Sequence, residues 1–546
     1  MRTDNIGFAL QRVAAIQPDT TAIVELTAFH GDSFSTATHS YQALEQRCDD
    51  YVKGFYDLGV RKGDRVAVLV PAGACVYALT FALFRLGAVV VFVDPGIGIK
   101  RMGRCLDDAE PRFFVGVLKA QLARLLFGWG RRSIQTSILV GPRWLAPWRS
   151  LAYLRQSGKE QKERSLSTAG GEDVAALLFT SGSTGAPKGV VYTHNMFSNQ
   201  VRMLKEAYAI EPGEVDLPTF PLFGLFDPAL GMTTIVPDMD PTRPAKADPK
   251  RLIAAIRQFG VTNLFGSPAL LDTLTRFTQR QGLRFDTLRR TLSAGAPVGR
   301  SVIERVRKML PPGADLHTPY GATECLPVAS ISASELLADD VAVRNASGGG
   351  VCVGKPIRDN EIRIIKVTDE PIVSSAQIDT LAQGDIGEIM VLGPTTSQSY
   401  YARPKANADS KVESDGERQF HRMGDLGYFD GEGRLWFCGR KAHRILRSDG
   451  FVCAVPVEQV LNQHPKVFRS ALVRGSGTQI VAVVEMERGY RLDTDCQREL
   501  RELCVRADLG IHLDTILEHS GFPVDIRHNA KIDRKVLGEW VRGHGG

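Results

Sequence analysis

An apolar stretch over residues 76–93 is the feature that most restricts how this chain folds. Arg85 and Gly87 interrupt it, and its second half is rich in valine. A membrane-spanning helix needs about 20 predominantly apolar residues, and valine-rich runs favour strands. A buried helix followed by a buried strand therefore explains the stretch better than a membrane span, and we expect no transmembrane segment.

Neighbouring segments alternate in the same way. Residues 41–58 are amphipathic with helical spacing, and residues 65–70 form a short apolar run after the turn at 62–64. This order predicts βαβ units and a mainly parallel sheet. Further strands are expected at 175–179, 261–265, 288–293, 387–392 and 434–438, the last two in a smaller β region.

The length of the chain points to more than one domain. Its 546 residues, 43% of them hydrophobic, exceed what one ordinary core accommodates. After residue 440 the pattern changes to that of a compact α+β unit. We predict a large N-terminal α/β domain over residues 1–440, with mainly parallel sheets and a β-rich subdomain, and a small mobile α+β domain over residues 441–546.

Composition excludes several classes of protein. The net charge of +6 is mild for this length, and no basic tract interleaved with aromatic residues occurs, so we expect no nucleic-acid partner. The nine cysteines are scattered singly without the spacing of a zinc site. Together with an N-terminus that lacks the apolar core of a signal peptide, they indicate reduced thiols in a cytoplasmic protein.

A loop rich in glycine and hydroxyl groups carries the strongest chemical signal. Residues 179–189 read FTSGSTGAPKG and follow an expected strand. Glycines expose backbone N–H groups, hydroxyls add donors, and a lysine adds charge, which together suit a polyphosphate. The spacing is not that of a Walker A loop. A flexible linker would not be flanked by a strand and a Pro-Lys-Gly end. The candidate phosphate-binding residues are Thr180, Ser181, Gly182, Ser183, Thr184, Gly185 and Lys188.

Further short motifs follow this loop along the chain. They are SAGAP at 293–297, YGATE at 320–324, MGD at 423–425, GR at 439–440 and NAKIDR at 529–534. A Gly-Asp or Gly-Arg pair alone is usually a turn. Read together and in this order, the motifs resemble the adenylate-forming superfamily of acyl-CoA synthetases, luciferases and nonribosomal peptide adenylation domains. The resemblance covers residues 41–534. It departs from the family where Met423 replaces threonine and Ala530 replaces glycine.

The resemblance implies ATP and Mg²⁺ as cofactors and assigns roles to single residues. Tyr320 would stack on adenine, and Asp425 would bind the ribose hydroxyls. Besides the phosphate loop, the implied ATP-binding residues are Gly295, Ala296, Pro297, Tyr320, Gly321, Asp425 and Arg440. The implied catalytic residues are Thr323 on phosphate, Glu324 as the Mg²⁺ ligand, and Lys531, which would bridge the carboxylate and the α-phosphate. A carboxylate suits a hard cation, and a lysine suits negative charge that develops in a transition state.

Three segments are more specifically similar to the β-lactone synthetases of bacterial long-chain olefin biosynthesis. They are residues 221–240, 265–268 and 439–444. This similarity implies a long-chain 2-alkyl-3-hydroxyalkanoic acid as substrate, whose own 3-hydroxyl attacks the acyl-adenylate without CoA. The expected substrate pocket consists of Phe223, Gly224, Leu225, Phe226, Gly266 and Ser267, with Gly224 removing a bulky wall.

Two other functions remain open on sequence grounds. The first is a long-chain fatty acyl-CoA ligase or acyl-AMP ligase. Ala442, at a hinge position where the family usually has Asp or Lys, weighs against the rotation that thioester formation uses. The second is a non-catalytic acyl-binding scaffold subunit, which the retained Lys188, Glu324, Asp425 and Lys531 argue against.

The segment over residues 118–148 stands apart. Leucines at 118, 122, 125 and 126 share one helical face, and tryptophans and arginines follow. We favour a surface helix packed on the protein's own core, because amphipathic helices of this kind are common. The alternative is peripheral contact with a membrane or with other olefin-biosynthesis enzymes in a multienzyme assembly.

Overall fold

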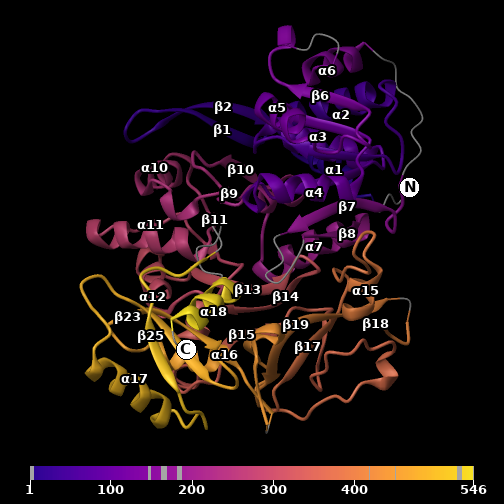
Figure 1. Cartoon of the computed structure of the whole chain (residues 1–546). Coiled ribbons are helices and arrows are strands. Elements are labelled where there is room, and N and C mark those ends of the chain that lie inside the picture. Colours follow the sequence, from indigo (N-terminus) through magenta and orange to yellow (C-terminus); the bar gives the residue numbers. More distant parts are fainter. Residues whose placement is uncertain are drawn as a thin grey trace.

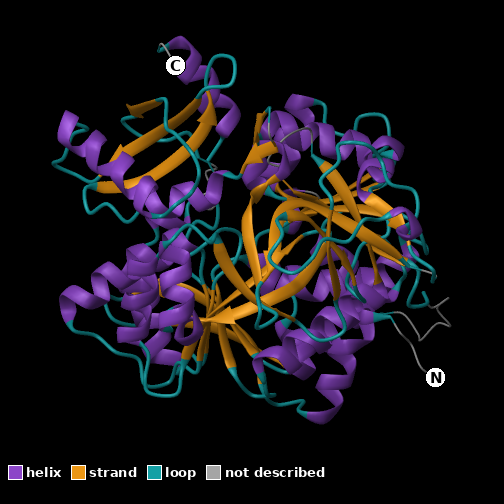
Figure 2. Ribbon diagram, turned by 90° about the horizontal axis from the view of Figure 1, so that it is seen from below, coloured by secondary structure: helices purple, strands orange, loops and turns teal. Residues whose placement is uncertain are grey.

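The computed structural model describes residues 5–145, 149–160, 169–180, 187–416, 418–448, 450–524 and 532–544. Within these ranges, the chain forms two large sheets with helices packed on their faces and a small C-terminal unit with its own sheet (Figures 1 and 2). The predicted fold class, an α/β region with a β-rich part followed by a small α+β unit, is confirmed.

The first sheet has the strand order β6–β5–β3–β4–β7–β8. Neighbouring strands are parallel except β7 and β8, which are antiparallel. The strands are β3 (Arg65–Leu69), β4 (Val89–Val93), β5 (Phe113–Val117), β6 (Thr136–Val140), β7 (Val174–Thr180) and β8 (Lys188–Thr193). The associated helices are α2 (Tyr41–Asp57), α3 (Ala74–Arg85), α4 (Ile99–Ala109), α5 (Leu118–Phe127) and α6 (Leu151–Lys159). The apolar stretch at 76–93 is thus a buried helix and a buried strand, as predicted.

The second sheet joins a parallel part to an antiparallel part (Figure 1). The parallel strands are β1 (Thr21–Phe29), β9 (Val215–Pro218), β10 (Thr233–Val236), β11 (Asn263–Phe265), β12 (Arg290–Leu292) and β13 (Asp315–Ala322), and β2 (Phe34–Ser40) lies antiparallel at the edge. The antiparallel strands are β14 (Cys325–Ser332), β15 (Val351–Pro356), β16 (Glu361–Ile365), β17 (Gly387–Leu392), β18 (Lys411–Glu413), β19 (Gln419–Phe429) and β20 (Leu435–Arg440). Of these strands, the sequence patterns predicted β11, β12, β17 and β20 and missed the others.

Helices cover the parallel part of this sheet. They are α7 (His194–Tyr208), α10 (Pro249–Phe259), α11 (Pro268–Gln281) and α12 (Arg300–Met309), with the short α8 (Pro221–Gly224) and α9 (Asp227–Leu230) between β9 and β10. Side-chain caps from Thr193, Asp248 and Ser267 begin α7, α10 and α11. Ser267, for example, accepts a hydrogen bond from the backbone N–H of Leu270 at the start of α11, at 3.3 Å.

The C-terminal unit has hydrophobic clusters of its own. One cluster consists of residues between 445 and 516, among them Leu461, Leu472 and Leu500. The unit contains α16 (Ala454–Leu461), β23 (Val467–Arg474), β24 (Ile480–Met486), α17 (Thr494–Arg506), β25 (Thr515–Glu518) and α18 (Arg534–Gly543). A separate core is what an independent domain requires. The boundary between residues 440 and 441 stays a prediction.

Two predictions from composition can be compared with the fold. The nine cysteines are all free thiols, most of them buried. No helix among the described residues is long and apolar enough to cross a membrane.

A buried pair of carboxyl groups attaches the segment of α8 and α9 to the second sheet. Asp216 lies in β9, and Asp227 is the first residue of α9; both are buried and hydrogen-bonded to each other. The Thr234 hydroxyl of β10 donates to Asp227 Oδ2 at 2.9 Å. Burial raises the pKa of Asp216 to about 7 and, together with the neighbouring carboxyl, raises the pKa of Asp227 well above its usual range. The pair therefore retains a proton near neutral pH.

This pair predicts how stability depends on pH. A carboxyl whose pKa is raised by folding stabilises the protein below its unfolded pKa of about 4, and this contribution is lost as pH rises towards the folded pKa. The side-chain amide of Asp227→Asn does not titrate, and its oxygen still accepts the hydrogen bond from the Thr234 hydroxyl. Between pH 5 and pH 8, the unfolding free energy of the wild type should therefore fall by about 1–3 kcal/mol more than that of the variant. Urea unfolding at both pH values measures this, and equal changes in the two proteins would contradict it.

Candidate functional site

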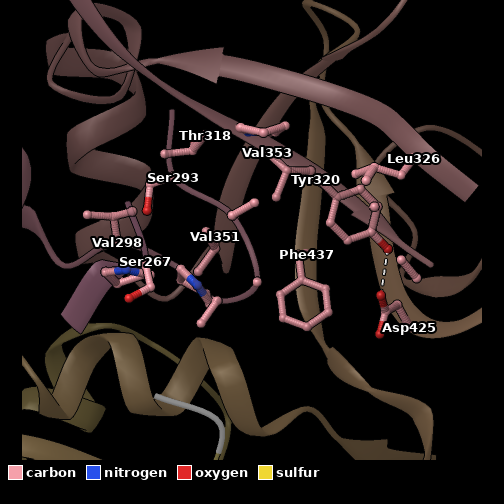
Figure 3. Close-up of a pocket in the computed structure, with 18 of the residues that line it drawn as sticks. Ser267, Ser293, Val298, Thr318, Tyr320, Leu326, Val351, Val353, Asp425 and Phe437 are labelled. Carbon is pink, nitrogen blue, oxygen red and sulfur yellow. Dashed lines mark hydrogen bonds between the residues drawn. The ribbon is translucent and has the colours of Figure 1, made fainter. Parts of the chain in front are cut away.

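A cavity of about 1910 Å³ lies between the two sheets and the C-terminal unit. One part of its wall is aromatic and comes from α3, α7, α8 and β11, with Phe81, Phe84, Phe197, Phe220, Phe223, Phe226 and Phe265. Another part is polar and contains the expected motifs at 293–297, 320–324, 423–425 and 439–440. Figure 3 shows residues of this wall, from Ser267 and Ser293 to Tyr320 and Asp425. The cavity therefore suits a ligand with both a polar and a long apolar portion.

Asp425 is the centre of the polar wall. The Tyr320 hydroxyl donates to Asp425 Oδ2 at 2.6 Å (Figure 3), and Arg440 Nη1 lies 3.0 Å from Asp425 Oδ1. The pairing of β19 with β20 places Asp425 opposite Arg440. Burial and the neighbouring carboxylate raise the pKa of Tyr320 well above its usual range, so the phenol stays protonated and keeps donating.

Arg440 is held between two acceptors. Besides the ion pair with Asp425, Nη1 donates to the backbone oxygen of Met423 at 3.1 Å. The carboxylate of Asp425 raises the pKa of Arg440 further, and Glu324 contributes to this in a smaller degree. A fixed guanidinium beside a carboxylate can bind a ligand that carries both hydroxyl groups and phosphate oxygens.

Glu324 faces the cavity next to Tyr400, a residue that the sequence did not reveal. The Tyr400 hydroxyl donates to Glu324 Oε1 at 2.5 Å. The ammonium of Lys188 lies 4.7 Å from the centre of the Tyr400 ring, and that of Lys411 lies 5.4 Å from it. One aromatic side chain thus links the expected metal ligand to two cations.

Lys411 and His421 form a buried basic layer behind Tyr400. Lys411 Nζ donates to the backbone oxygen of Ser397, and burial lowers the pKa of Lys411 to about 8. Burial and the nearby Lys411 lower the pKa of His421 well below its usual range, and its Nδ1 has no hydrogen-bond partner. Nothing in the sequence distinguishes this lysine, in the short strand β18, from an ordinary surface lysine.

The structure brings most expected nucleotide residues together. Gly295, Ala296, Pro297, Gly321 and Thr323 all line the same cavity as Tyr320. Gly295 has a φ of +95°, which residues with a side chain rarely adopt, so its backbone conformation requires glycine.

The expected phosphate loop is described only at its two ends. Thr180, at the end of β7, pairs in register with Lys188 at the start of β8, and Lys188 lines the cavity. Residues 181–186, which include Ser181, Gly182, Ser183, Thr184 and Gly185, lie outside the described residues, as does Lys531. At the end of the C-terminal motif, Arg534 also lines the cavity and forms an ion pair with Glu458 at 2.6 Å.

Four of the six residues expected in the substrate pocket lie at the wall of the cavity. Phe223, Leu225, Phe226 and Ser267 line the cavity, whereas Gly224 and Gly266 are not among the described residues that line it.

The reason is close packing of the backbone. A Cβ added to Gly224 would lie 2.4 Å from the Tyr77 hydroxyl oxygen and 2.9 Å from Pro218 Cγ, and one added to Gly266 would lie 3.0 Å from the Leu271 side chain. Gly224 therefore allows α8 to approach α3 and β9, and it opens no space for a substrate.

Known proteins resemble this chain over nearly all of its length. Residues 10–401 match the family described as AMP-binding enzyme. The olefin beta-lactone synthetases of Xanthomonas campestris and Stenotrophomonas maltophilia are each 45% identical to the chain, over 98% and 99% of it and over 97% and 98% of their own lengths. The solved structure of an amide bond synthetase from Marinactinospora thermotolerans has a TM-score of 0.77 at 23% identity, covering 98% of this chain and 99% of its own.

The packing of Gly224 gives a prediction about stability. Gly224→Ala should destabilise the protein by about 1–3 kcal/mol, because the new methyl group overlaps the Tyr77 oxygen. Tyr77→Phe removes that oxygen, so the alanine should cost less in the Tyr77→Phe background. A double-mutant cycle of unfolding free energies measures the coupling. Strictly additive effects would show that Tyr77 does not restrict residue 224.

Proposed function

The chain belongs to the AMP-binding enzyme family, and from this premise we propose that it activates a 2-alkyl-3-hydroxyalkanoic acid with ATP and closes it to a β-lactone. The first step would give acyl-AMP and pyrophosphate; the second would release AMP. The single observation that carries the proposal is the continuous cavity that joins an aromatic wall to the Tyr320, Asp425 and Glu324 cluster. The 45% identity to two olefin beta-lactone synthetases supports the same reaction.

The polar wall provides the groups that a nucleotide needs. The Tyr320 hydroxyl and Arg440 hold the Asp425 carboxylate at the cavity wall. There it would bind the ribose hydroxyls, as the resemblance implies. Lys188 and the loop from Thr180 to Gly185 would bind the phosphates, and Gly295, Ala296 and Pro297 would lie beside the adenine.

Mg²⁺ fits the donors at Glu324. The Tyr400 hydroxyl donates to Oε1 of Glu324, and the other carboxylate oxygen would bind the cation, with Thr323 beside it. No group of three potential ligands occurs among the residues described, and Mg²⁺ usually combines one or two carboxylates with substrate phosphates. Bound with ATP, the ion would neutralise charge on the phosphates. Tyr400 would orient Glu324 for this contact.

Glu324→Gln should therefore raise the Mg²⁺ concentration needed for half-maximal activity by at least about 10–100-fold, because a neutral amide is a weaker ligand than a carboxylate. Tyr400→Phe keeps the carboxylate and removes only its hydrogen bond, so it should shift the Mg²⁺ titration less. Acid-dependent pyrophosphate release at varied Mg²⁺ measures both effects. An unchanged titration for Glu324→Gln would exclude Glu324 as the ligand.

We propose that Lys531 stabilises the negative charge that develops during adenylate formation, because its ammonium group would contact both the carboxylate and the α-phosphate. Arg534, three residues further on, donates to the backbone oxygen of Leu472 at 3.0 Å and pairs with Glu458. These contacts fix the start of α18 beside the cavity and support a role for the motif.

Lys531→Ala should slow adenylate formation by a factor that corresponds to about 2–4 kcal/mol, the usual effect of one lost electrostatic donor. ATP binding should persist, because the nucleotide contacts lie elsewhere. Lys535→Ala, in the exposed first turn of α18, is the matched control and should be nearly neutral. Undiminished pyrophosphate release by Lys531→Ala would refute the assignment.

The second step needs no further substrate. The oxygen of the 3-hydroxyl attacks the acyl carbon, the bond from that carbon to the AMP oxygen breaks, and the hydroxyl proton is released. The nucleophile is already attached to the acyl group, which makes the attack intramolecular and favourable.

An ion pair would restrain rotation of the expected C-terminal domain. Nζ of Lys441, the first residue of that domain, lies 3.0 Å from Glu388 Oε2 in the other domain.

The experiment that tests the proposed function is incubation with ATP, Mg²⁺ and a 2-alkyl-3-hydroxy acid, with and without CoA, followed by NMR of the products. A β-lactone formed equally in both reactions is the expected result. An acyl-CoA formed only with CoA would replace the proposal with a CoA ligase. ATP bound without any product would indicate a non-catalytic acyl-binding subunit.

We also propose where the enzyme acts. The absence of a spanning helix in the described residues accords with a cytoplasmic enzyme whose partner is a long-chain hydroxy acid. Other enzymes must supply this acid and consume the lactone. Both compounds are apolar, so a multienzyme assembly would pass them on before they partition into membranes.

A further inference from the structure

The outer face of α5 is apolar and has no partner within the described part of the chain. No residue of this helix is buried, and Leu125, Leu126 and Phe127 are 66%, 80% and 56% exposed. Ala120 and Ala123 pack on the core beneath the helix instead. α5 is thus a surface helix packed on the protein's own core, as expected, but it packs through its alanines while its leucines are exposed. We call the exposed residues of α5 the α5 surface: Leu118, Leu122, Leu125, Leu126 and Phe127.

Two features extend this surface. The Phe127 ring stacks on the buried Trp129, with ring centres 6.1 Å apart, so its orientation is fixed although it is exposed. Strand β5 leads into α5, and β6 lies parallel to β5 with Val140 opposite Val117. The exposed Trp144 and Leu145, which follow β6, therefore lie at the same end of the sheet as Leu118. An apolar area of this kind usually marks an interaction site.

The segment that contains the α5 surface carries charge of one sign, and the exposed Asp107 of α4 adds one carboxylate beside it, where it accepts a hydrogen bond from the backbone N–H of Gly130 at 3.0 Å. Residues 111–159 contain nine lysines and arginines and no aspartate or glutamate, although the whole chain carries a net charge of only +6. The rest of the chain is thus net acidic. Lys119 in α5 is exposed, and so are Arg131 and Arg132, which follow this helix. Arg149, just before α6, and Lys159, at its end, are exposed as well.

We propose that the α5 surface docks on an anionic phospholipid bilayer. The leucines and Phe127 would enter the boundary between headgroups and acyl chains, and the surrounding ammonium and guanidinium groups would contact lipid phosphates. A bilayer accounts for both observations at once, since it offers an apolar layer directly beneath a layer of negative charge. The inference goes beyond the proposed function, because it holds whichever acid the enzyme activates.

The test is co-sedimentation of the full chain with two kinds of vesicle, phosphatidylcholine alone and phosphatidylcholine mixed with phosphatidylglycerol. The protein should bind the anionic vesicles, bind the neutral ones much less, and dissociate as salt is added. Two variants address the two parts of the surface. The apolar variant combines Leu122→Ser, Leu125→Ser and Leu126→Ser, and the charge variant combines Lys119→Glu, Arg131→Glu and Arg132→Glu.

Each variant should bind anionic vesicles at least about tenfold more weakly than the wild type. The matched controls change exposed residues elsewhere and should bind normally: Val343→Ser with Val505→Ser for the apolar variant, and Lys250→Glu, Arg280→Glu and Lys308→Glu for the charge variant. Far-UV circular dichroism and pyrophosphate exchange with a water-soluble acid check that the variants stay folded and active. Vesicle binding is measured without turnover, so a protein that does not bind vesicles can be distinguished from one that does not form the β-lactone.

Three results would overturn the proposal. The first is a wild type that does not sediment with anionic vesicles. The second is equal binding by the wild type and the apolar variant. The third is self-association of the wild type in size-exclusion chromatography that the apolar variant abolishes, without vesicle binding; this would assign the α5 surface to a second copy of the chain.

Discussion

The contact of Asp425 with Tyr320 and Arg440 is the interaction on which the site depends. Tyr320 comes from β13, at the end of the parallel part of the second sheet, whereas Asp425 and Arg440 come from adjacent antiparallel strands. The carboxylate is only 4% exposed, and a buried charge without partners costs several kcal/mol. The three residues therefore fix the junction of the two parts of the sheet, and the cavity opens beside that junction.

Around this junction the protein holds positive charge that it does not neutralise completely. Lys411 is buried with a lowered pKa, and the ammonium groups of Lys188 and Lys411 both lie near the ring of Tyr400. Such an arrangement weakens the empty fold, because burying a charge without a full partner is unfavourable. It also orients cations before a polyphosphate arrives, so that little reorganisation is needed when negative charge develops during the reaction. A departure of this kind from the rules of stable packing is expected at a functional site.

The sequence predicted the parts of this structure that depend on local patterns. The stretch at 76–93 was correctly predicted as a buried helix and strand, since charge and valine content decide between the alternatives. The motifs at 293–297, 320–324, 423–425 and 439–440, which stand out in the sequence, meet at one cavity. Tyr400 and Lys411 were missed because their roles come from contacts with residues distant in sequence; Tyr400 is 76 positions from Glu324. Gly224 was misread because a glycine that opens a cavity and one that allows close packing look identical in sequence.

Transfer of ¹⁸O from the substrate's carboxylate distinguishes adenylate formation followed by attack of the substrate's own hydroxyl from other routes to the lactone. A 3-hydroxy acid labelled with ¹⁸O in both carboxylate oxygens would be converted with ATP, and the products would be analysed by mass spectrometry. Our account predicts one labelled oxygen in AMP and one in the lactone carbonyl, with an unlabelled ring oxygen that comes from the 3-hydroxyl. Label in the ring oxygen, or AMP without label, would contradict it.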